Sequence, residues 1–286
     1  MAITIGNNIS SLRAQSRLAK TDLALNKTYE KLSSGLRINS ASDDAAGLAI
    51  ADDLRAKIRI GQVAVRNAND GISTIAIADS ALAEVEGVLT RLAELAQQSS
   101  TGTFSSTQRS ALQSEFTALS SEIERIAVTT EFNGIKILSG STSITLQVGF
   151  DSASTSQITI NNVTGTLAAL GLASSGSSVL TYSLNASSLE LSQSASRITL
   201  DAVTGAIQSL AQTRGSLGAI ESRLHLAVSN LSVARENFAA AESRIRDLDI
   251  AEEAANLTRL NILQNAGVAV LAQANQAPAL ALKLLS

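Results

Sequence analysis

Residues 203–248 read VTGAIQSLAQTRGSLGAIESRLHLAVSNLSVARENFAAAESRIRDL, and apolar side chains recur along this stretch at alternating intervals of three and four residues. One row holds the large side chains Val203, Leu210, Leu217, Leu224, Leu231, Phe238 and Ile245. The other row holds mostly small ones, Ala206, Thr213, Ile220, Ala227, Ala234, Ala241 and Leu248. A heptad seam of this length predicts one helix, roughly 70 Å long, that needs partner helices to cover its apolar face.

The partner helices are expected in the N-terminal half of the chain. A second seam with the same alternation runs from Gly61 to Ala96, with Asp79 and Glu86 as acidic interruptions. Further apolar residues between 85 and 95 widen this face, so this helix should contact more than one neighbour. A shorter helix is expected around 112–126, after a turn at 99–107, and another over about the first 33 residues.

The heptad register of the long stretch ends at Leu248, which predicts a structural joint near 246–249. A new and more polar phase follows, with members Ile250, Ala254, Leu257, Asn261, Gln264, Val268 and Leu271. The joint falls within the charge-dense run ESRIRDLDIAEE (242–253). This run is either a solvated helix face or an ionic joint between subunits, and the spacing does not choose between the two.

The middle of the chain has a different character. About half of the residues from Ser139 to Ser188 are Ser, Thr or Gly, and Asn133-Gly134 marks a turn. Alternation of apolar and polar residues over 144–150 predicts a strand, and Ile158 and Ile160 predict a second. A third strand is predicted at Leu180, Tyr182 and Leu184. We therefore expect a small β region that interrupts the helices.

The composition excludes several kinds of chemistry. Hydrophobic residues make up 45% of the 286 residues but aromatic residues only 2%, which favours closely packed helices. With no cysteine and one histidine, the chain offers no thiolate or histidine-rich metal site, and His225 falls on the solvent side of the heptad. The net charge of −3 does not favour nucleic-acid binding. We assign no catalytic residue, cofactor or metal, and we do not expect an enzyme.

Residues 261–282 carry no charge, but their amides and Pro278 make a poor lipid-facing helix, so this segment is expected to be buried in protein rather than inserted in a membrane. The first residues, MAITIGNNISS, show no basic region followed by an apolar one. They are therefore not expected to form a classical secretory signal.

Several motifs together resemble those of bacterial flagellin, the subunit of the flagellar filament. The N-terminal family signature is similar to NNISSLRAQSRLAK (7–20) and LNKTYEKLSSGLRINSASDDAAGLAIADDLRA (25–56). The β segment of the family is similar to FNGIKIL (132–138) and ITLQVG (144–149), and the C-terminal signature is similar to residues 243–286. Only about twenty residues, roughly 174–193, stand where many flagellins insert outer domains, which implies a minimal form.

The resemblance implies a mainly α-helical fold: a long antiparallel helical rod or coiled coil with a small β-hairpin region, and terminal helices that pair into an inner coiled coil. The expected domains are an inner coiled coil (1–45 and 247–286), a rod domain (46–173, with the β-hairpin region 132–165, and 194–246), and the short connection 174–193. The side chains expected to pack in the subunit or the filament are Leu18, Leu25, Leu32, Leu217, Leu224, Leu231, Phe238, Ile245, Leu257, Val268 and Leu271.

The resemblance also implies partners. They are further copies of the chain in a helical homopolymer, the export chaperone of the flagellar type III apparatus, and the filament cap and hook-associated proteins. The animal flagellin-sensing Toll-like receptor would bind the monomer at Arg91, Leu95 and Glu115. The alternative functions are a hook–filament junction protein and a secreted helical adhesin.

Overall fold

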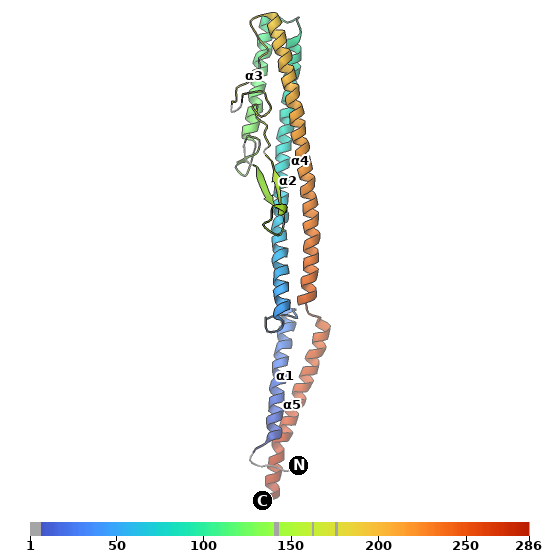
Figure 1. Ribbon diagram of the computed structural model, residues 1–286. Helices are drawn as coiled ribbons and strands as arrows, with labels where there is room; N and C mark the ends of the chain where they lie inside the picture. The colour runs from blue at the N-terminus through green and yellow to red at the C-terminus, as the bar shows by residue number, and fades with distance from the viewer. Residues whose placement is uncertain (1–6, 140–142, 162, 175–176, 286) are drawn as a thin grey trace. The chain divides into compact units, whose positions relative to one another are not determined.

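The computed structural model describes residues 7–139, 143–161, 163–174 and 177–285, which are mainly α-helical (Figure 1). The helices are α1 (Ile9–Ser34), α2 (Ala45–Ser100), α3 (Ser106–Thr129), α4 (Leu189–Arg246) and α5 (Ile250–Leu285). The strands are β1 (Glu131–Phe132), β2 (Ile135–Lys136), β3 (Ile144–Gln147) and β4 (Gln157–Ile160), and a 3-10 turn, η1 (Ser154–Ser156), precedes β4. The predicted fold class, long helices with a small β region, is confirmed.

The chain divides into two compact units. Unit 1 holds the residues up to Ile58 and from Glu236 onward, and unit 2 holds Arg59–Arg235. Both α2 and α4 contribute residues to each unit. The domain boundaries expected from the sequence lie at the start of α2 and the end of α4 instead, and the names given to those domains stay a prediction.

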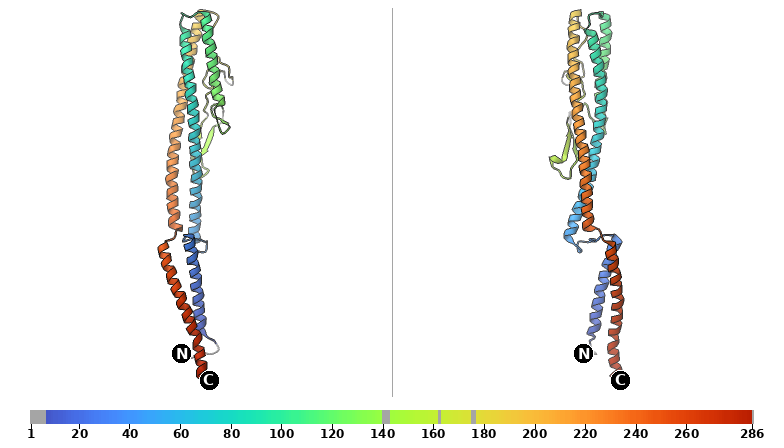
Figure 2. Two further views of the ribbon diagram at one scale, coloured as in Figure 1. Left: turned by 180° about the vertical axis from the view of Figure 1, so that it is seen from behind. Right: turned by 90° about the vertical axis from the view of Figure 1, so that its right-hand side faces the viewer.

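Unit 2 is built on the two predicted heptad seams, with α3 packed beside α2 and α4 (Figure 2). The large row of α4 and the matching row of α2 point into one core, where Leu224 and Leu82 have no exposed surface. On α3, Phe116 and Ile123 complete the same core. The members of the two seams that are buried in this core are Ala68, Ile75, Leu82, Leu89, Ala96, Val203, Ala206, Leu210, Leu217 and Leu224.

Two of the three predicted strands are present. β3 pairs antiparallel with β4, with Ile144 opposite Ile160 and Leu146 opposite Ile158. A further two-residue hairpin, β1–β2, forms around Asn133-Gly134, where both residues have positive φ, 51° and 77°. Positive φ at both central positions matches the twist of paired strands, so the Asn-Gly turn specifies this hairpin.

The third predicted strand, at Leu180, Tyr182 and Leu184, is wrong. Leu184 is fully buried, but its backbone is satisfied by helix side chains: its N–H donates to Gln113 Oε1 at 2.5 Å and its carbonyl accepts from Ser99 and Ser196. In this part of the chain the described residues form only a single bridge, Ala173 to Leu180. The alternation of apolar residues predicted the burial correctly, but side-chain hydrogen bonds take the place of hydrogen bonds between strands.

The turn between α2 and α3 is held by a buried arginine that the sequence analysis did not single out. Arg109 is 1% exposed, and its guanidinium donates to the carbonyls of Ser99, Thr101 and Phe104. The last carbonyls of a helix have no partner within it, so a cation there satisfies them and also interacts favourably with the helix dipole. Arg109 therefore fixes where α2 ends.

Unit 1 contains the antiparallel pair of α1 and α5 (Figure 1). The two helices are linked where α1 ends. Gly35 is the C-cap of α1, with φ +68°, and Leu36 forms a β-bridge with Asp247, in the segment between α4 and α5. Leu25 and Thr28 are the buried residues of α1. The helix break near 246–249 is present, since α4 ends at Arg246 and α5 begins at Ile250.

The predicted register of the polar phase on α5 is partly wrong. Leu257, Asn261, Gln264 and Leu271 are half-buried, but Ile250, Ala254 and Val268 are exposed. Gly267 takes the place expected for Val268: a Cβ built on it would lie 3.3 Å from Leu18 Cδ1. The seam follows the glycine because a leucine from α1 needs that space, and periodicity of apolar residues does not report free space.

Candidate interaction surfaces

The surface formed by Arg91, Glu94 and Glu115 joins α2 to α3. Arg91 donates from Nε and Nη2 to Glu115 Oε1 at 3.0 and 2.8 Å, and from Nη1 to Glu94 Oε2 at 2.8 Å. The hydrogen bonds with Glu115 and Glu94 raise the pKa of the Arg91 guanidinium. All three side chains remain about half exposed, so a partner could reach them. Arg91 and Glu115 are the two residues expected here from the sequence, and the fold brings them together.

Leu95 does not lie on this surface. Its side chain is 1% exposed and belongs to the core that α2 shares with α3 and α4. The expected position of Leu95 on one surface with Arg91 and Glu115 is therefore wrong, and its contact with a receptor stays a prediction. The physical reason is that residues 91 and 95 are one turn apart on α2 but the apolar face is wide enough to bury one of them.

Polar side chains link α1 to α5 along the helix pair. Asp22 accepts a hydrogen bond from Gln264 at 2.8 Å, and Ser11 donates to Asn275 at 2.6 Å. Asn8 caps α1 and also donates to the backbone carbonyl of Ala274 at 2.8 Å. Two amides of the charge-free segment, those of Gln264 and Asn275, thus have specific partners within the chain.

Large apolar side chains of both terminal helices face outward. Val268 is 52% exposed and Ile262 63%. The outward set is Ile9, Leu12, Leu23 and Tyr29 on α1, and Ile250, Ile262, Leu263, Val268 and Val270 on α5. Monomeric proteins rarely leave so many apolar side chains in water on one small unit, so this set of exposed side chains, called the outer face of unit 1 below, indicates that the terminal helices have interaction partners.

The residues assigned to packing fall into three groups. Leu25, Leu217, Leu224 and Leu231 are buried within the chain. Leu18, Leu32, Phe238, Ile245, Leu257 and Leu271 are half-buried. Val268 is exposed and forms part of the outer face of unit 1. Whether the second and third groups pack between subunits stays a prediction.

The charge-dense run 242–253 makes ion pairs and hydrogen bonds within the chain. Neither alternative drawn from the sequence, a solvated helix face or an ionic joint between subunits, included such contacts. Glu242 accepts from Arg55 at 2.7 and 2.9 Å, and Arg246 pairs with Asp52 at 3.3 Å. Asp249 accepts from the N–H groups of Ala251 and Glu252, which caps α5. These charges therefore tie the start of α2 to the end of α4 and begin the next helix.

Arg37 is a residue that the sequence analysis missed at this place. Its side chain donates to the carbonyl of Ile245 at 2.6 and 3.2 Å, and its own N–H donates to the carbonyl of Arg246 at 2.7 Å. Leu248 returns a backbone hydrogen bond to Gly35. A basic residue just after a helix, as here, can donate to the unpaired carbonyls at the C-terminus of a neighbouring helix, but the sequence does not say which helix that is.

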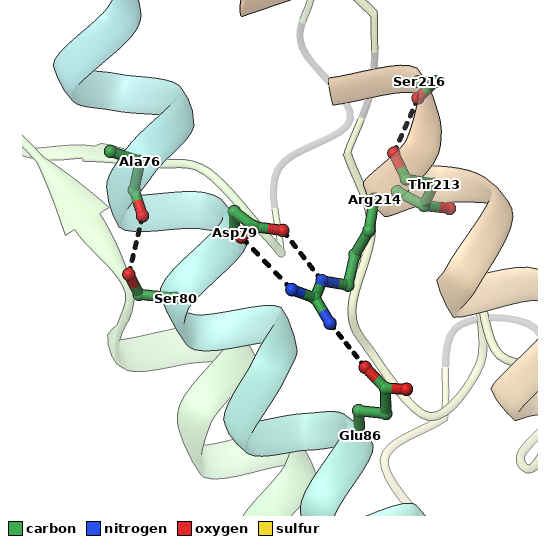
Figure 3. A network of polar contacts seen from close by, with 7 residues as sticks. All are labelled: Ala76, Asp79, Ser80, Glu86, Thr213, Arg214 and Ser216. Carbon is green, nitrogen blue, oxygen red and sulfur yellow. Dashed lines mark hydrogen bonds and ion pairs between the residues drawn. The ribbon is translucent and has the colours of Figure 1, made fainter. Parts of the chain in front are cut away.

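A second ionic network crosses from α4 to α2 (Figure 3). Arg214 donates to both oxygens of Asp79 and to Glu86, and Asp79 contributes most to raising the pKa of its guanidinium. Asp79 and Glu86 are the acidic interruptions of the α2 seam, so the fold explains why they interrupt it. The sequence alone offered no partner for them.

The described residues offer little that suggests chemistry. Within them no group of three or more His, Cys, Asp or Glu side chains is placed to hold a metal ion. His225 is exposed on α4 and lies 3.8 Å from Glu221. None of the described helices has the length and apolarity needed to cross a membrane.

Comparisons with known proteins agree at both ends of the chain. Residues 5–143 match the family described as the bacterial flagellin N-terminal helical region, and residues 200–285 match the bacterial flagellin C-terminal helical region. The chain is 42% identical to a flagellin of Halalkalibacterium halodurans and 40% identical to a flagellin of Bacillus subtilis, each over 98% of this chain and 99% of the relative. It is 40% identical, over the same shares, to the flagellar filament 33 kDa core protein of Treponema phagedenis. The crystal structure of Bacillus cereus flagellin is 25% identical, covers 62% of this chain and 94% of its own, and gives a TM-score of 0.48.

Proposed function

The chain belongs to the bacterial flagellin family and is thus a structural subunit of the extracellular flagellar filament, and from this premise we propose how it assembles, how it is exported and what recognises it. The family serves motility through a self-assembled polymer and is not a family of enzymes. The two further alternatives, a hook–filament junction protein and an adhesin, are not favoured, because the relatives above are named flagellin or flagellar filament core protein.

Assembly proceeds through the outer face of unit 1. The observation that supports this proposal is the set of exposed apolar side chains on α1 and α5, among them Ile262 at 63% and Leu12 at 62% exposure. Burying an apolar surface is favourable by about 25 cal/mol per Å², so copies of the chain gain stability when these faces meet. The filament cap and the hook-associated proteins are the partners expected where the polymer ends.

Export proceeds through the flagellar type III apparatus, and a chaperone covers the C-terminal segment beforehand. The exposed residues Ile262, Leu263, Val268 and Val270 lie on one helix with no charge from Asn261 onward until Lys283. A helix of this composition is prone to associate in an unassembled chain, which is why a dedicated partner would be needed.

The free monomer is recognised by the animal flagellin-sensing Toll-like receptor through Arg91 and Glu115. Both side chains are about half exposed, and the arginine already holds two carboxylates in place. Preorganised charged groups of this kind give an interface specificity and fast association. Leu95 supports this surface from beneath and makes no contact of its own.

The assembly proposal is tested by electron microscopy of the purified chain and two variants. Ile262→Asp places a charge on the outer face of unit 1 and should abolish filaments while leaving the far-ultraviolet circular dichroism of unit 2 unchanged. Val179→Asp is the matched control, because Val179 is 72% exposed in an irregular segment of unit 2. Filaments of Ile262→Asp at the wild-type yield would show that assembly uses another surface.

A further inference from the structure

We infer that Asn8 completes the hydrogen bonding of α5 at Pro278, so that the last part of α5 becomes helical only when α1 is docked against it. The inference deepens the proposed function, since it concerns how the terminal helices of a filament subunit become ordered. It rests on one side chain that serves two helices at once.

Pro278 leaves a gap in the hydrogen bonding of α5. In an α-helix each carbonyl accepts from the N–H four residues later, so the carbonyl of Ala274 would accept from residue 278. Proline has no N–H and is strongly unfavourable in a helix interior. Yet α5 runs from Ile250 to Leu285 and includes Pro278. The carbonyl of Ala274 therefore needs a donor from outside its own helix.

Asn8 supplies that donor. Its Nδ2 lies 2.8 Å from the carbonyl oxygen of Ala274 in a half-buried contact. Its Oδ1 accepts at 3.0 Å from the N–H of Ser11, which makes Asn8 the N-cap of α1. One amide thus starts α1 with its oxygen and completes α5 with its nitrogen. Aspartate is an equally good N-cap but has no donor, so only the amide serves both helices.

The contact is in register with the rest of the helix pair. Ser11 donates to Asn275, and Gln264 donates to Asp22, along the same antiparallel alignment. When α1 is absent, the residue before Pro278 is biased away from helical geometry, and α5 is expected to end before the proline. Docking of α1 supplies the missing hydrogen bond, so the two ends of the chain become ordered together.

A double-mutant cycle tests the link. Asn8→Asp keeps the cap and removes the donor, and Pro278→Ala gives Ala274 its regular donor back. We expect Asn8→Asp to raise the critical concentration for polymerisation about fivefold, as for a lost hydrogen bond, and to have no effect in the Pro278→Ala background. Ser11→Ala is the matched control: it removes the neighbouring contact to Asn275 and should change the critical concentration equally in both backgrounds.

A second measurement does not depend on polymerisation. The chain has no cysteine, so Asp22→Cys and Gln264→Cys can be joined by a short bifunctional thiol reagent to hold α1 on α5 in the soluble chain. Hydrogen exchange at residues 275–285 should then be slow, faster with Asn8→Asp, and slow again when Pro278→Ala is added.

The outcomes separate the two proposals. If Asn8→Asp exchanges as slowly as the cross-linked parent, or if Pro278→Ala does not restore slow exchange, the inference is overturned. If the exchange pattern is as expected but no variant polymerises, the inference stands and the assembly proposal fails.

Discussion

The guanidinium of Arg214 on α4 binds the carboxylate of Asp79 on α2 through two hydrogen bonds, Nε to Oδ1 at 2.8 Å and Nη2 to Oδ2 at 3.2 Å. Its Nη1 donates to Glu86, one heptad farther along α2, at 2.5 Å. A seam of leucines fits almost as well after a slide of one heptad, because apolar side chains again meet apolar side chains. After such a slide Ile207 or Glu221 would face the two carboxylates, so Arg214 selects the register.

Replacing Arg214 should therefore lower the free energy of unfolding only slightly, because the main role of the residue is to fix the register of α4 against α2. The three side chains are about one third to two fifths exposed, so solvent screens the ion pairs, and Arg214→Ala should cost only about 1 kcal/mol of unfolding free energy. Arg214→Lys should recover only part of the lost stability, because lysine cannot bind both oxygens of Asp79 through a planar fork. Thermal unfolding measures both variants. Arg125→Ala is the control, because Arg125 pairs with Glu122 within α3 alone, and a loss as large as that of Arg214→Ala would contradict the argument.

The heptad also predicts opposite outcomes for two adjacent positions. Leu224 is fully buried, and Leu224→Asp would place an unpaired carboxylate in the core of unit 2 at a cost of several kcal/mol. His225 is exposed, and His225→Ala should change the unfolding free energy by no more than about 0.5 kcal/mol. Denaturant unfolding of the two variants compares them directly. Equal midpoints for both would mean that the register of α4 is misassigned.

The helices could be predicted because burial repeats with the period of the helix. On α4 the row from Val203 to Leu231 is buried and the row from Thr213 to Ala241 is half-buried, as the spacing implies. The partner of Arg214 could not be predicted in the same way. Asp79 is far away in the sequence, and it becomes the nearest carboxylate only after the antiparallel alignment of α2 and α4 is known.

Predictions from periodicity failed where space or side-chain hydrogen bonds decide the outcome. Gly267 replaces Val268 in the seam because Leu18 needs room, and Leu184 has its backbone satisfied by Gln113 and two serines rather than by a strand. The family resemblance places Leu95 on a surface, although its side chain is buried on the apolar face that the spacing itself predicts. Each failure concerns the surroundings of a residue, which a local pattern does not contain.

Removal of the C-terminal segment should separate folding from assembly. Deleting residues 261–286 removes Ile262, Leu263, Val268 and Val270 from the outer face of unit 1 but no residue of unit 2. We expect a soluble chain whose unit 2 unfolds at the wild-type midpoint and which forms no filaments under the electron microscope. Filaments from the truncated chain would refute the assembly proposal, and loss of the unit 2 transition would show that the two units do not fold separately.

The free chain should have less helix than the filament. Among the residues of α1, only Leu25 and Thr28 are buried, and helices in proteins draw most of their stability from tertiary packing. Circular dichroism should show helicity rising on polymerisation, and limited proteolysis of the monomer should trim the chain toward residues ~45 and ~245. Helicity that is the same before and after assembly would mean that α1 and α5 are stable as a pair alone.

Recognition by the Toll-like receptor should depend on Arg91 and Glu115 in a way that differs from Leu95. Arg91→Ala and Glu115→Ala remove half-exposed charges that pair across α2 and α3, so each should weaken the response of a receptor reporter cell while costing little stability, because solvent screens exposed ion pairs. Leu95→Ala instead leaves a cavity in the core and should cost about 2–5 kcal/mol, with any loss of response following the loss of folded protein.

Measuring the response at equal folded concentration separates these effects: the charge variants should stay weak and Leu95→Ala should recover. Ser110→Ala, at an exposed position on α3, is the control and should respond as the parent does. A weak response from Leu95→Ala even after this correction would mean that the receptor rearranges α2 to reach the leucine.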